Sequence, residues 1–237
     1  MPPMIGKITL FPYDFEPNGW INCDGRLIPT SENETLFTLL GTTFGGDGEN
    51  TFAVPDLTRI TPPNCRYCMT VKGAFNEDFY PGIVGETFLS VASPSARNLM
   101  ECTGQTLTKQ QAPLLLMFMG SRFGGDGVKN FNLPDLRGKA PAGLRYSIAV
   151  QGNDPNFPRE PYLGELFLLP YEASTENLML CNGNRMSTSQ SNGTLFSLLG
   201  MRFGGDAQQF ALPDLRAAAP PNYSYYMSGR GVMPPRA

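Results

Sequence analysis

The chain has 237 residues, of which 41% are hydrophobic and 16% are charged, and its formal net charge is −3. Without a run of basic residues, this balance argues against a nucleic-acid partner, and the apolar content argues against disorder. No apolar stretch reaches the roughly 18 residues of a membrane-spanning helix, and no secretory signal peptide is visible at the start. The 26 glycines and 22 prolines favour a turn-rich, mainly β protein.

One segment of the chain occurs three times at a constant spacing. An interval of 79 residues separates the members of three sets of identical residues: Gly6, Gly85 and Gly164; Cys23, Cys102 and Cys181; Pro55, Pro134 and Pro213. Such a repeat sets the architecture, and a unit of this size buries only a marginal core by itself. The sequence therefore predicts a mainly β fold with short helices (α+β), made of three tandem repeats of about 79 residues that pack on each other.

The repeats are separated by connectors that are rich in proline and aromatic residues. We place the connectors at residues 74–84 and 153–163, which leaves repeats at 1–73, 85–152 and 164–237. Enzymes seldom need three copies of one active site along a chain, whereas assemblies and multivalent binders commonly repeat a surface. The repeat therefore favours a structural or binding role.

Within a repeat, the first expected elements are a strand and a hairpin. The apolar positions of residues 5–11 predict a strand. Two apolar runs then flank Asp24-Gly25, and this dipeptide is a strong signal for a two-residue hairpin turn with a positive φ at both residues. We therefore expect residues 20–23 and 26–28 to pair with each other.

A short helix is expected next. Ser31 and Glu34 have the spacing of a capping box ahead of an apolar run, and Gly41 follows the run where a C-cap glycine would stand. In the second repeat, Pro113 falls in the first helical turn, where proline is tolerated. The expected helices cover Leu36–Leu40, Leu115–Met119 and Leu195–Leu199.

Each repeat then carries the motif Phe-Gly-Gly-Asp, at residues 44–47, 123–126 and 203–206. The alternatives are a tight turn in which the aspartate accepts local N–H groups, or a calcium or phosphate site. No Asp-x-Asp-x-Asp-Gly ladder and no following Lys-Ser accompany the motif, so the turn is favoured. Two strands close the unit, a short one at Phe52 and a last one over residues 66–71.

The five cysteines indicate structural roles. Cys23 and its two equivalents each precede a turn, and we expect them to be small, buried and unpaired; the alternative is a disulfide or a three-cysteine metal site on a pseudo-threefold axis. Cys65 and Cys68 form a CxxC pair in an expected strand, where residues i and i+3 point to opposite faces. Without a second CxxC, this pair is weak support for zinc.

The chemistry of most enzymes is missing. The chain has no histidine, which removes the usual general base, the commonest metal ligand and any Ser-His or Cys-His pair. Carboxylates such as Asp24, Asp47 and Asp56 lie in turn-like sequences, and no spacing places two of them across a cleft. We therefore expect no enzyme activity, no catalytic or cofactor-binding residue, no cofactor and no metal site. A glycan-acting enzyme is the least favoured alternative.

A series of motifs falls in order along repeat 1: Gly19-Trp20, Cys23-Asp24-Gly25, Leu36-Phe37, Leu39-Leu40-Gly41, Phe44-Gly45-Gly46-Asp47-Gly48 and Val54-Pro55-Asp56-Leu57. In this order and spacing, the repeat resembles the phage tail collar domain, which also occurs in bacterial proteins called microcystin-dependent proteins. The match extends over nearly all of each repeat, although repeats 2 and 3 have Asn-Leu in place of Gly-Trp. The resemblance implies a structural role in tail-fibre-like appendages, where such domains assemble as trimers and can serve adhesion.

The leading hypothesis is therefore a self-assembling structural subunit of an extracellular, phage-tail-fibre-like filament. The first alternative is a tail-fibre component that binds a receptor or carbohydrate and does not polymerise. The expected partner is a second copy of the chain, and the alternative adds a cell-surface receptor or glycan. Nucleic acid and a membrane span are not expected.

A length match predicts how subunits would join. Twelve positions separate the glycines that flank each connector, Gly73 and Gly85, and Gly152 and Gly164. A next molecule placed end to end puts the same interval between Gly231 and Gly6. We therefore expect head-to-tail stacking, which grows an open filament unless its rotation closes a ring; a chance match in length is the alternative. The expected assembly interface comprises Met1, Pro2, Pro3, Met4, Ile5, Val232, Met233, Pro234 and Pro235.

Overall fold

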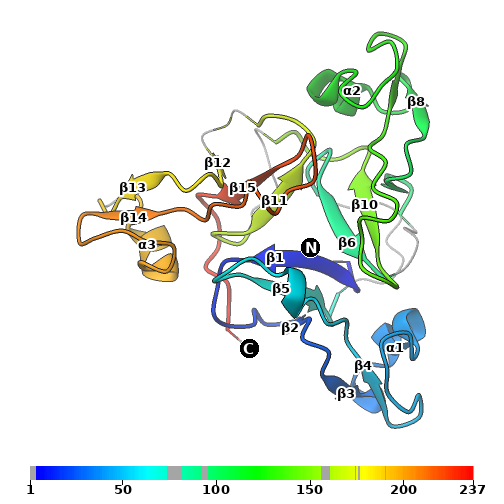
Figure 1. Ribbon diagram of the computed structural model, residues 1–237, viewed down its shortest axis with the longest axis vertical. Coiled ribbons are helices and arrows are strands. Elements are labelled where there is room, and N and C mark those ends of the chain that lie inside the picture. The colour runs from blue at the N-terminus through cyan, green and yellow to red at the C-terminus, as the bar shows by residue number, and fades with distance from the viewer. Residues whose placement is uncertain are drawn as a thin grey trace.

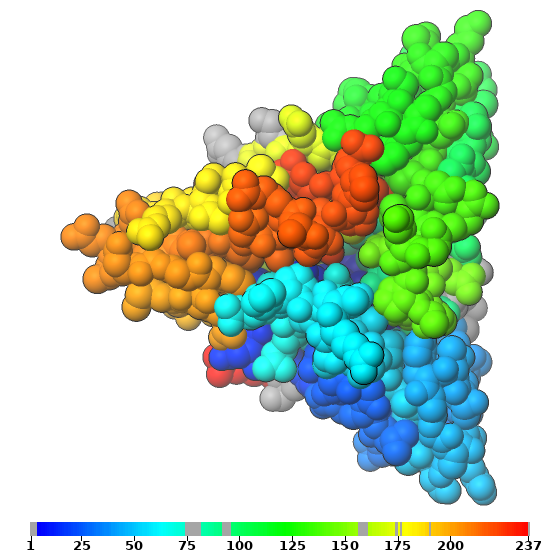
Figure 2. Space-filling view, in the orientation of Figure 1, coloured from blue at the N-terminus to red at the C-terminus, as the bar shows by residue number. Residues whose placement is uncertain are grey.

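The computed structural model describes residues 4–73, 82–91, 96–155, 161–173, 175, 177–189 and 191–236. Three repeats surround one axis, and each sends an arm outward from a central group of strands (Figure 1). The space-filling view has the same three-pointed outline, with the repeats in contact around the centre (Figure 2). The predicted mainly β architecture of three packed repeats is confirmed, and the packing is a pseudo-threefold ring.

The centre of the molecule consists of three equivalent groups of strands. The first strands are β1 (Lys7–Phe11), β6 (Thr87–Ser90) and β11 (Leu166–Leu169). The closing strands are β5 (Arg66–Thr70), β10 (Arg145–Ala149) and β15 (Ser224–Ser228). The outer strands are β2 (Trp20–Asn22), β7 (Leu99–Glu101) and β12 (Leu178–Leu180). Each closing strand lies antiparallel between the first and outer strands of its own repeat, which confirms the predicted first and last strands.

The first strands also pair with one another and close the ring. β6 lies antiparallel to β1 with Leu89 opposite Ile8, and β11 lies antiparallel to β6 with Leu168 opposite Thr87. The second pairing joins the residues equivalent to those of the first pairing, one repeat further along the chain. β11 in turn lies next to β1. Because an open strand edge carries unpaired N–H and C=O groups, a single repeat would leave edges that the ring covers.

Alternation along the first strands sends their side chains to two faces, and both faces carry apolar side chains, because Phe11 and Phe88 belong to smaller clusters on the second face. Ile8, Leu10 and Leu89 belong to the main hydrophobic core. On the other face, Lys7 Nζ lies 2.6 Å from Glu86 Oε1, and both side chains are almost completely buried. This ion pair joins repeats 1 and 2, and removal of one partner would leave a buried charge without compensation.

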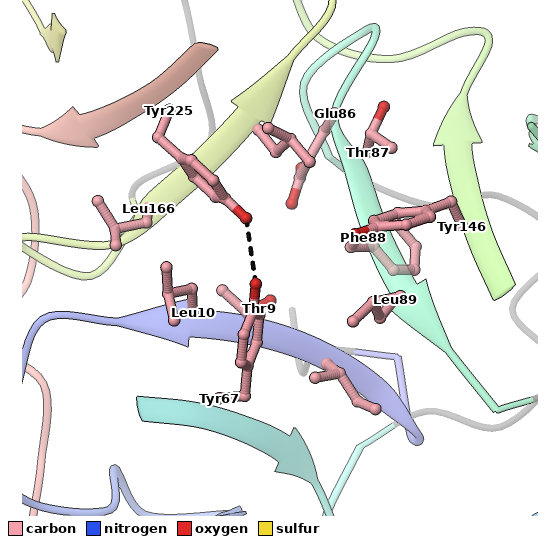
Figure 3. Close-up of a pocket in the computed structure, with 12 residues that line it drawn as sticks. Thr9, Leu10, Tyr67, Glu86, Thr87, Phe88, Leu89, Tyr146, Leu166 and Tyr225 are labelled. Carbon is pink, nitrogen blue, oxygen red and sulfur yellow. Dashed lines mark hydrogen bonds between the residues drawn. The ribbon is translucent and has the colours of Figure 1, made fainter. Parts of the chain in front are cut away.

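A set of tyrosines lies near the axis. Tyr67, Tyr146 and Tyr225 occupy the same position in β5, β10 and β15. Tyr67 and Tyr225 point toward each other, and their hydroxyl oxygens are 3.3 Å apart (Figure 3). The three side chains help to line a cavity of about 20 Å³, which has room for about one water molecule. The centre of the ring is therefore a packed seam between repeats.

The hairpin predicted at Asp24-Gly25 is wrong. β2 pairs with β5, and Asp24 forms a bridge with Asp56 instead. Gly25 has a φ of 78°, but Asp24 is not among the residues with a positive φ, and the predicted turn needs a positive φ at both positions. The chain leaves the central sheet here and enters the arm, where the Gly25 N–H donates to the carbonyl of Pro55 (3.2 Å).

Each arm is a two-stranded ribbon that carries a helix. The ribbons are β3 (Leu27–Pro29) with β4 (Thr51–Ala53), β8 (Thr106–Thr108) with β9 (Asn130–Asn132), and β13 (Arg185–Ser187) with β14 (Gln209–Ala211). The helices are α1 (Glu34–Leu40), α2 (Pro113–Met119) and α3 (Gly193–Leu199). Repeat 1 also has the 3₁₀ turns η1 (Thr30–Glu32) and η2 (Thr58–Ile60). The predicted helices and the short strand at Phe52 are confirmed.

The residues at the helix ends agree with the caps predicted from the sequence, except at the N-terminus of α1. Gly41 is the C-cap of α1 with a φ of 52°, as predicted, and Pro113 stands in the first turn of α2. The capping box at Ser31 is wrong, because Ser31 lies in η1 and Asn33 is the N-cap of α1 without a side-chain cap bond. The chain makes one 3₁₀ turn before the α-helix begins, and this turn moves the cap along the chain.

The three joints between repeats use equivalent contacts. In each joint, the loop ahead of a closing strand lies on the Phe-Gly-Gly-Asp region of another repeat. The contacts are Asn64 Nδ2 to the Arg202 carbonyl (3.1 Å) for repeats 1 and 3, Gly143 against Phe44 for repeats 2 and 1, and Tyr223 against Phe123 (5.9 Å between ring centroids) for repeats 3 and 2. The third joint therefore repeats the other two, and the ring is closed within one chain.

A buried tyrosine fastens two of these joints. Tyr13 donates its hydroxyl to the carbonyl of Leu163, and Tyr171 donates to the carbonyl of Val84 at 2.5 Å. Each of the two tyrosines is 1% exposed. The position midway between them in the repeat pattern holds Ala92, whose side chain has no hydroxyl to donate.

We predict that Tyr13→Phe and Tyr171→Phe each lower the free energy of unfolding by about 1 kcal/mol. Phenylalanine keeps the packing but leaves a buried carbonyl without its donor. Urea unfolding followed by circular dichroism measures the change, and Tyr162→Phe at a half-buried tyrosine serves as the control. Equal midpoints for all three variants and the parent would contradict the contribution of these hydroxyls.

Candidate assembly interface

The N-terminal segment is one side of the interface that the length match predicts. Met1, Pro2 and Pro3 lie outside the described residues. Met4 packs on a small apolar cluster of repeat 2 that contains Phe88, and its carbonyl accepts a hydrogen bond from Thr70 Oγ1 at 2.5 Å. Ile5 is buried in the main core. The described part of this segment is therefore held between repeats 1 and 2 of its own chain.

The C-terminal segment is the other side. Val232 forms a parallel bridge with Tyr162, in the connector just ahead of repeat 3. Its N–H donates to the carbonyl of Pro161 (3.0 Å), and its carbonyl accepts from the N–H of Leu163 (2.8 Å). Repeat 2 has the equivalent bridge between Ile83 and Asn153. Val232, at the end of repeat 3, is therefore paired in the same way as Asn153, at the start of the connector that follows repeat 2.

The rest of the tail crosses to repeat 1. The Pro235 carbonyl accepts a hydrogen bond from the Asn18 N–H at 2.8 Å, and Arg236 forms a bridge with Pro17. The guanidinium carbon of Arg236 lies 4.7 Å from the ring centroid of Phe15, which is a cation–π distance. The tail thus reaches the first repeat of its own molecule, where the length match predicted the first repeat of the next one.

Parts of this tail are open to solvent. Val232 and Met233 are 47% and 48% exposed, Pro234 is buried and Pro235 is exposed. The two terminal segments occupy different joints, because Met4 faces repeat 2 and the tail bridges repeats 3 and 1.

The prediction of an assembly interface at the tail stays a prediction, and it did not include the surface of repeat 1 that the tail contacts. Phe15 stands where repeats 2 and 3 have Pro94 and Ala173, and this departure from the repeat is the signal that could have revealed the surface. At the same joint, Asp14 forms an ion pair of 2.7 Å with Arg202 of repeat 3. The hydrogen bond from Arg202 is the main cause of the lowered pKa of the Asp14 carboxyl.

The Phe-Gly-Gly-Asp loops are turns that their aspartates stabilise. Asp47 Oδ1 accepts hydrogen bonds from three backbone N–H groups of residues 49–51 at 2.8 to 3.0 Å. Asp126 and Asp206 accept backbone N–H groups in the same way. These bonds lower the pKa of the Asp47 carboxyl to about 2. The interpretation of the motif as a turn is confirmed.

All five cysteines are buried and free, and the burial predicted for Cys23, Cys102 and Cys181 is confirmed. Cys68 lies in β5, but Cys65 lies one residue ahead of it, so the prediction that both cysteines stand in one strand is wrong for Cys65. Cys65 belongs to the main core and Cys68 to a separate cluster. Burial raises the pKa of the Cys102 thiol to about 12 and raises the pKa values of Cys23 and Cys181 well above the ordinary value. These thiols are therefore protonated at neutral pH.

The other carboxylates that the sequence singled out are engaged in local bonds. Asp24 pairs with Arg26 at 2.5 Å, and Asp56 accepts the N–H of Thr58 at 3.0 Å. Within the described ranges, no three His, Cys, Asp or Glu side chains gather closely enough to hold a metal ion. The same part of the chain contains no helix with the length and apolar character to cross a membrane.

The model of the family described as Phage Tail Collar Domain matches the chain three times, at residues 6–62, 85–141 and 164–220. Together these matches cover well over half of the chain. The chain belongs to the phage tail collar domain family. The resemblance carried by the sequence motifs is thus confirmed in all three repeats, and no curated protein matches the chain significantly.

Membership in this family makes the chain a structural protein of the phage tail-fibre type, associated with a virion or a tail-like assembly. The family is structural rather than enzymatic. Each matched segment ends shortly before a closing strand. The strands β5, β10 and β15, which carry the tyrosines near the axis, therefore lie outside the matched segments.

The aspartate turns predict a pH dependence of stability. Because N–H bonds depress the pKa of folded Asp47, their stabilisation is fully present above the unfolded pKa of about 4 and is lost as the pH falls through about 2. We expect the unfolding temperature to drop between about pH 5 and pH 2. Asp47→Asn should unfold at a lower temperature at neutral pH and show a smaller drop.

Scanning calorimetry over this pH range measures both effects. Glu49→Gln removes the same charge from a neighbouring residue and is the matched control. A variant Asp47→Asn that follows the parent at every pH would show that the carboxylate does not hold the turn.

The buried cysteines predict slow labelling. With a pKa of about 12, only on the order of one thiol in 10⁵ at Cys102 is a thiolate at pH 7, and the thiolate is the reactive form. A thiol reagent should label Cys23, Cys102 and Cys181 slowly in the native protein and rapidly in denaturant, as followed by mass spectrometry. Rapid native labelling of all three would contradict their burial.

Proposed function

We propose that the protein is a self-assembling structural subunit of an extracellular, phage-tail-fibre-like filament in which molecules stack head to tail. One observation supports this proposal above the others. The chain itself links repeat 1 to repeat 2 and repeat 2 to repeat 3, whereas repeats 3 and 1 meet only through noncovalent contacts. At this third joint, repeat 1 of a second molecule can take the place of the molecule's own repeat 1.

The contacts of the tail are ones that a second molecule can make equally well. The tail supplies the Pro235 carbonyl and the Arg236 guanidinium, and repeat 1 supplies the Asn18 N–H and the Phe15 ring. A tail that leaves its own repeat 1 opens a site that the tail of another molecule fits. Exchange of an identical segment is a low-cost route to assembly, because each interaction that breaks within one molecule forms again between two molecules.

The short tail restricts the geometry of such an exchange. Val232 stays bonded to residues 161 and 163, so only residues 233–236 need to move. Four extended residues span at most about 14 Å, and the receiving repeat 1 must therefore lie directly against the donating repeat 3. Such a contact is heterologous, and it grows an open filament when its rotation does not close.

Truncation tests the proposal. Deleting residues 232–237 or residues 1–4 should abolish long assemblies and leave a folded subunit. Negative-stain electron microscopy detects the filaments, and circular dichroism with size-exclusion chromatography checks the fold. Filaments of normal length from both truncated proteins would rule out this joint.

A point substitution gives a sharper comparison. Arg236→Ala removes the contact with Phe15 and should raise the protein concentration at which filaments form. Arg230→Ala removes an exposed arginine ahead of Val232 and should leave that concentration unchanged. Equal effects of the two substitutions would point to net charge rather than to the tail contact.

A further inference from the structure

Four aromatic rings of repeat 1 form a continuous stack. The rings of Phe11, at the end of β1, and Trp20, at the start of β2, meet edge to face with 4.9 Å between their centroids. Phe11 stacks on Tyr13 at 5.3 Å, and Tyr13 stacks on Phe15 at 5.1 Å. These separations are those of favourable aromatic pairs. Repeat 1 therefore contains an aromatic column that ends at Phe15.

The inner rings of the aromatic column are fixed by their surroundings. Phe11, Tyr13 and Trp20 are buried, and the Tyr13 hydroxyl donates to the carbonyl of Leu163. Phe15 is half-buried, and because one face of its ring stacks on Tyr13, the other face is left for a ligand. The column thus holds the Phe15 ring in one orientation before anything binds, which lowers the entropic cost of binding.

The tail places an arginine at the end of the aromatic column. The guanidinium carbon of Arg236 lies 4.7 Å from the centroid of the Phe15 ring, within the range of a cation–π contact. One residue earlier, the Pro235 carbonyl accepts a hydrogen bond from the Asn18 N–H at 2.8 Å. Repeat 1 therefore contacts two consecutive residues of the tail, one through its main chain and the other through its side chain.

A carboxylate near the same joint favours a positive charge on the tail. The hydrogen bond from Arg202 is the main cause of the lowered pKa of Asp14, and the charge of Arg236 lowers this pKa further. Asp14 is exposed, so its attraction for the tail is weak. The aromatic ring is therefore the stronger reason for an arginine at this position, because a planar guanidinium stacks on a ring and an ammonium does not.

The ring and the arginine both depart from the threefold repeat. Neither recurs at the equivalent positions of the other repeats, which hold Pro94 and Ala173 in place of the ring and Asp78 and Phe157 in place of the cation. Two residues that each occur once, and that meet at the one joint without a covalent link, indicate a specific contact rather than general packing.

We propose that the end of the aromatic column is a recognition site for the Pro-Pro-Arg segment of the tail, and that Phe15 selects arginine when this tail comes from a second copy of the chain. The second copy rests on the proposed function, since in a single molecule its own tail occupies the site. The two prolines have a fixed φ, so the segment loses little freedom when it binds.

Hydrogen exchange of the Asn18 amide, measured by NMR on the full chain below the concentration at which filaments form, tests this recognition. Arg236→Gln and Phe15→Leu should each speed the exchange about threefold, because a cation–π contact is lost. Arg236→Lys should also speed it, although the charge is kept. Arg230→Gln and Phe37→Leu make the same changes at an exposed arginine and a half-buried phenylalanine outside the site, and they should exchange like the parent.

A peptide with the sequence of residues 232–237 tests binding from a separate molecule. Added at millimolar concentration to the Arg236→Gln chain, it should slow the exchange of Asn18, and the same peptide with glutamine in place of its arginine should slow it less. Equal exchange in the parent and in either Arg236→Gln or Arg236→Lys would overturn the proposal, and so would a peptide that gives no protection or protects equally without its arginine. A parent chain that shows this recognition but forms no filaments would contradict the proposed function alone.

Discussion

The fold depends on the closure of β1, β6 and β11 around one axis. These first strands pair with closing strands of their own repeats and with one another. The closing strands pair with these three first strands, the outer strands pair with the closing strands, and the arms extend outward from this sheet. A single repeat would expose the strand edges and the core residues that its neighbours cover in the ring.

Because the three repeats belong to one chain, equivalent positions in the repeats can hold different residues. Tyr13 and Tyr171 fasten two joints through their hydroxyls, while the sequence has Ala92 at the remaining position. Phe15 ends an aromatic column in repeat 1, where the other repeats have Pro94 and Ala173. A scaffold with threefold geometry can in this way carry features that occur once.

The parts of the fold that could be predicted from the sequence depend on near neighbours. The helix that ends at Gly41 and the turn held by Asp47 have their signals within a few residues. The hairpin at Asp24-Gly25 could not be judged locally, because the true partner of β2 is β5, some fifty residues along the chain. The length match pointed to the tail as an interface but not to its contact with Phe15, because length does not tell which molecule supplies the neighbouring repeat.

Lys7, Glu86 and Glu165 occupy the same position in the three repeats, and Lys7 meets Glu86 at 2.6 Å in the ring. A homotrimer of separate first repeats would set lysine against lysine at every such contact, and a homotrimer of second or third repeats would set glutamate against glutamate. Like charges this close in a buried place repel strongly. The chain is thus a covalent trimer whose three repeats are not equivalent. The single buried lysine at this position restricts the ring to one copy of repeat 1.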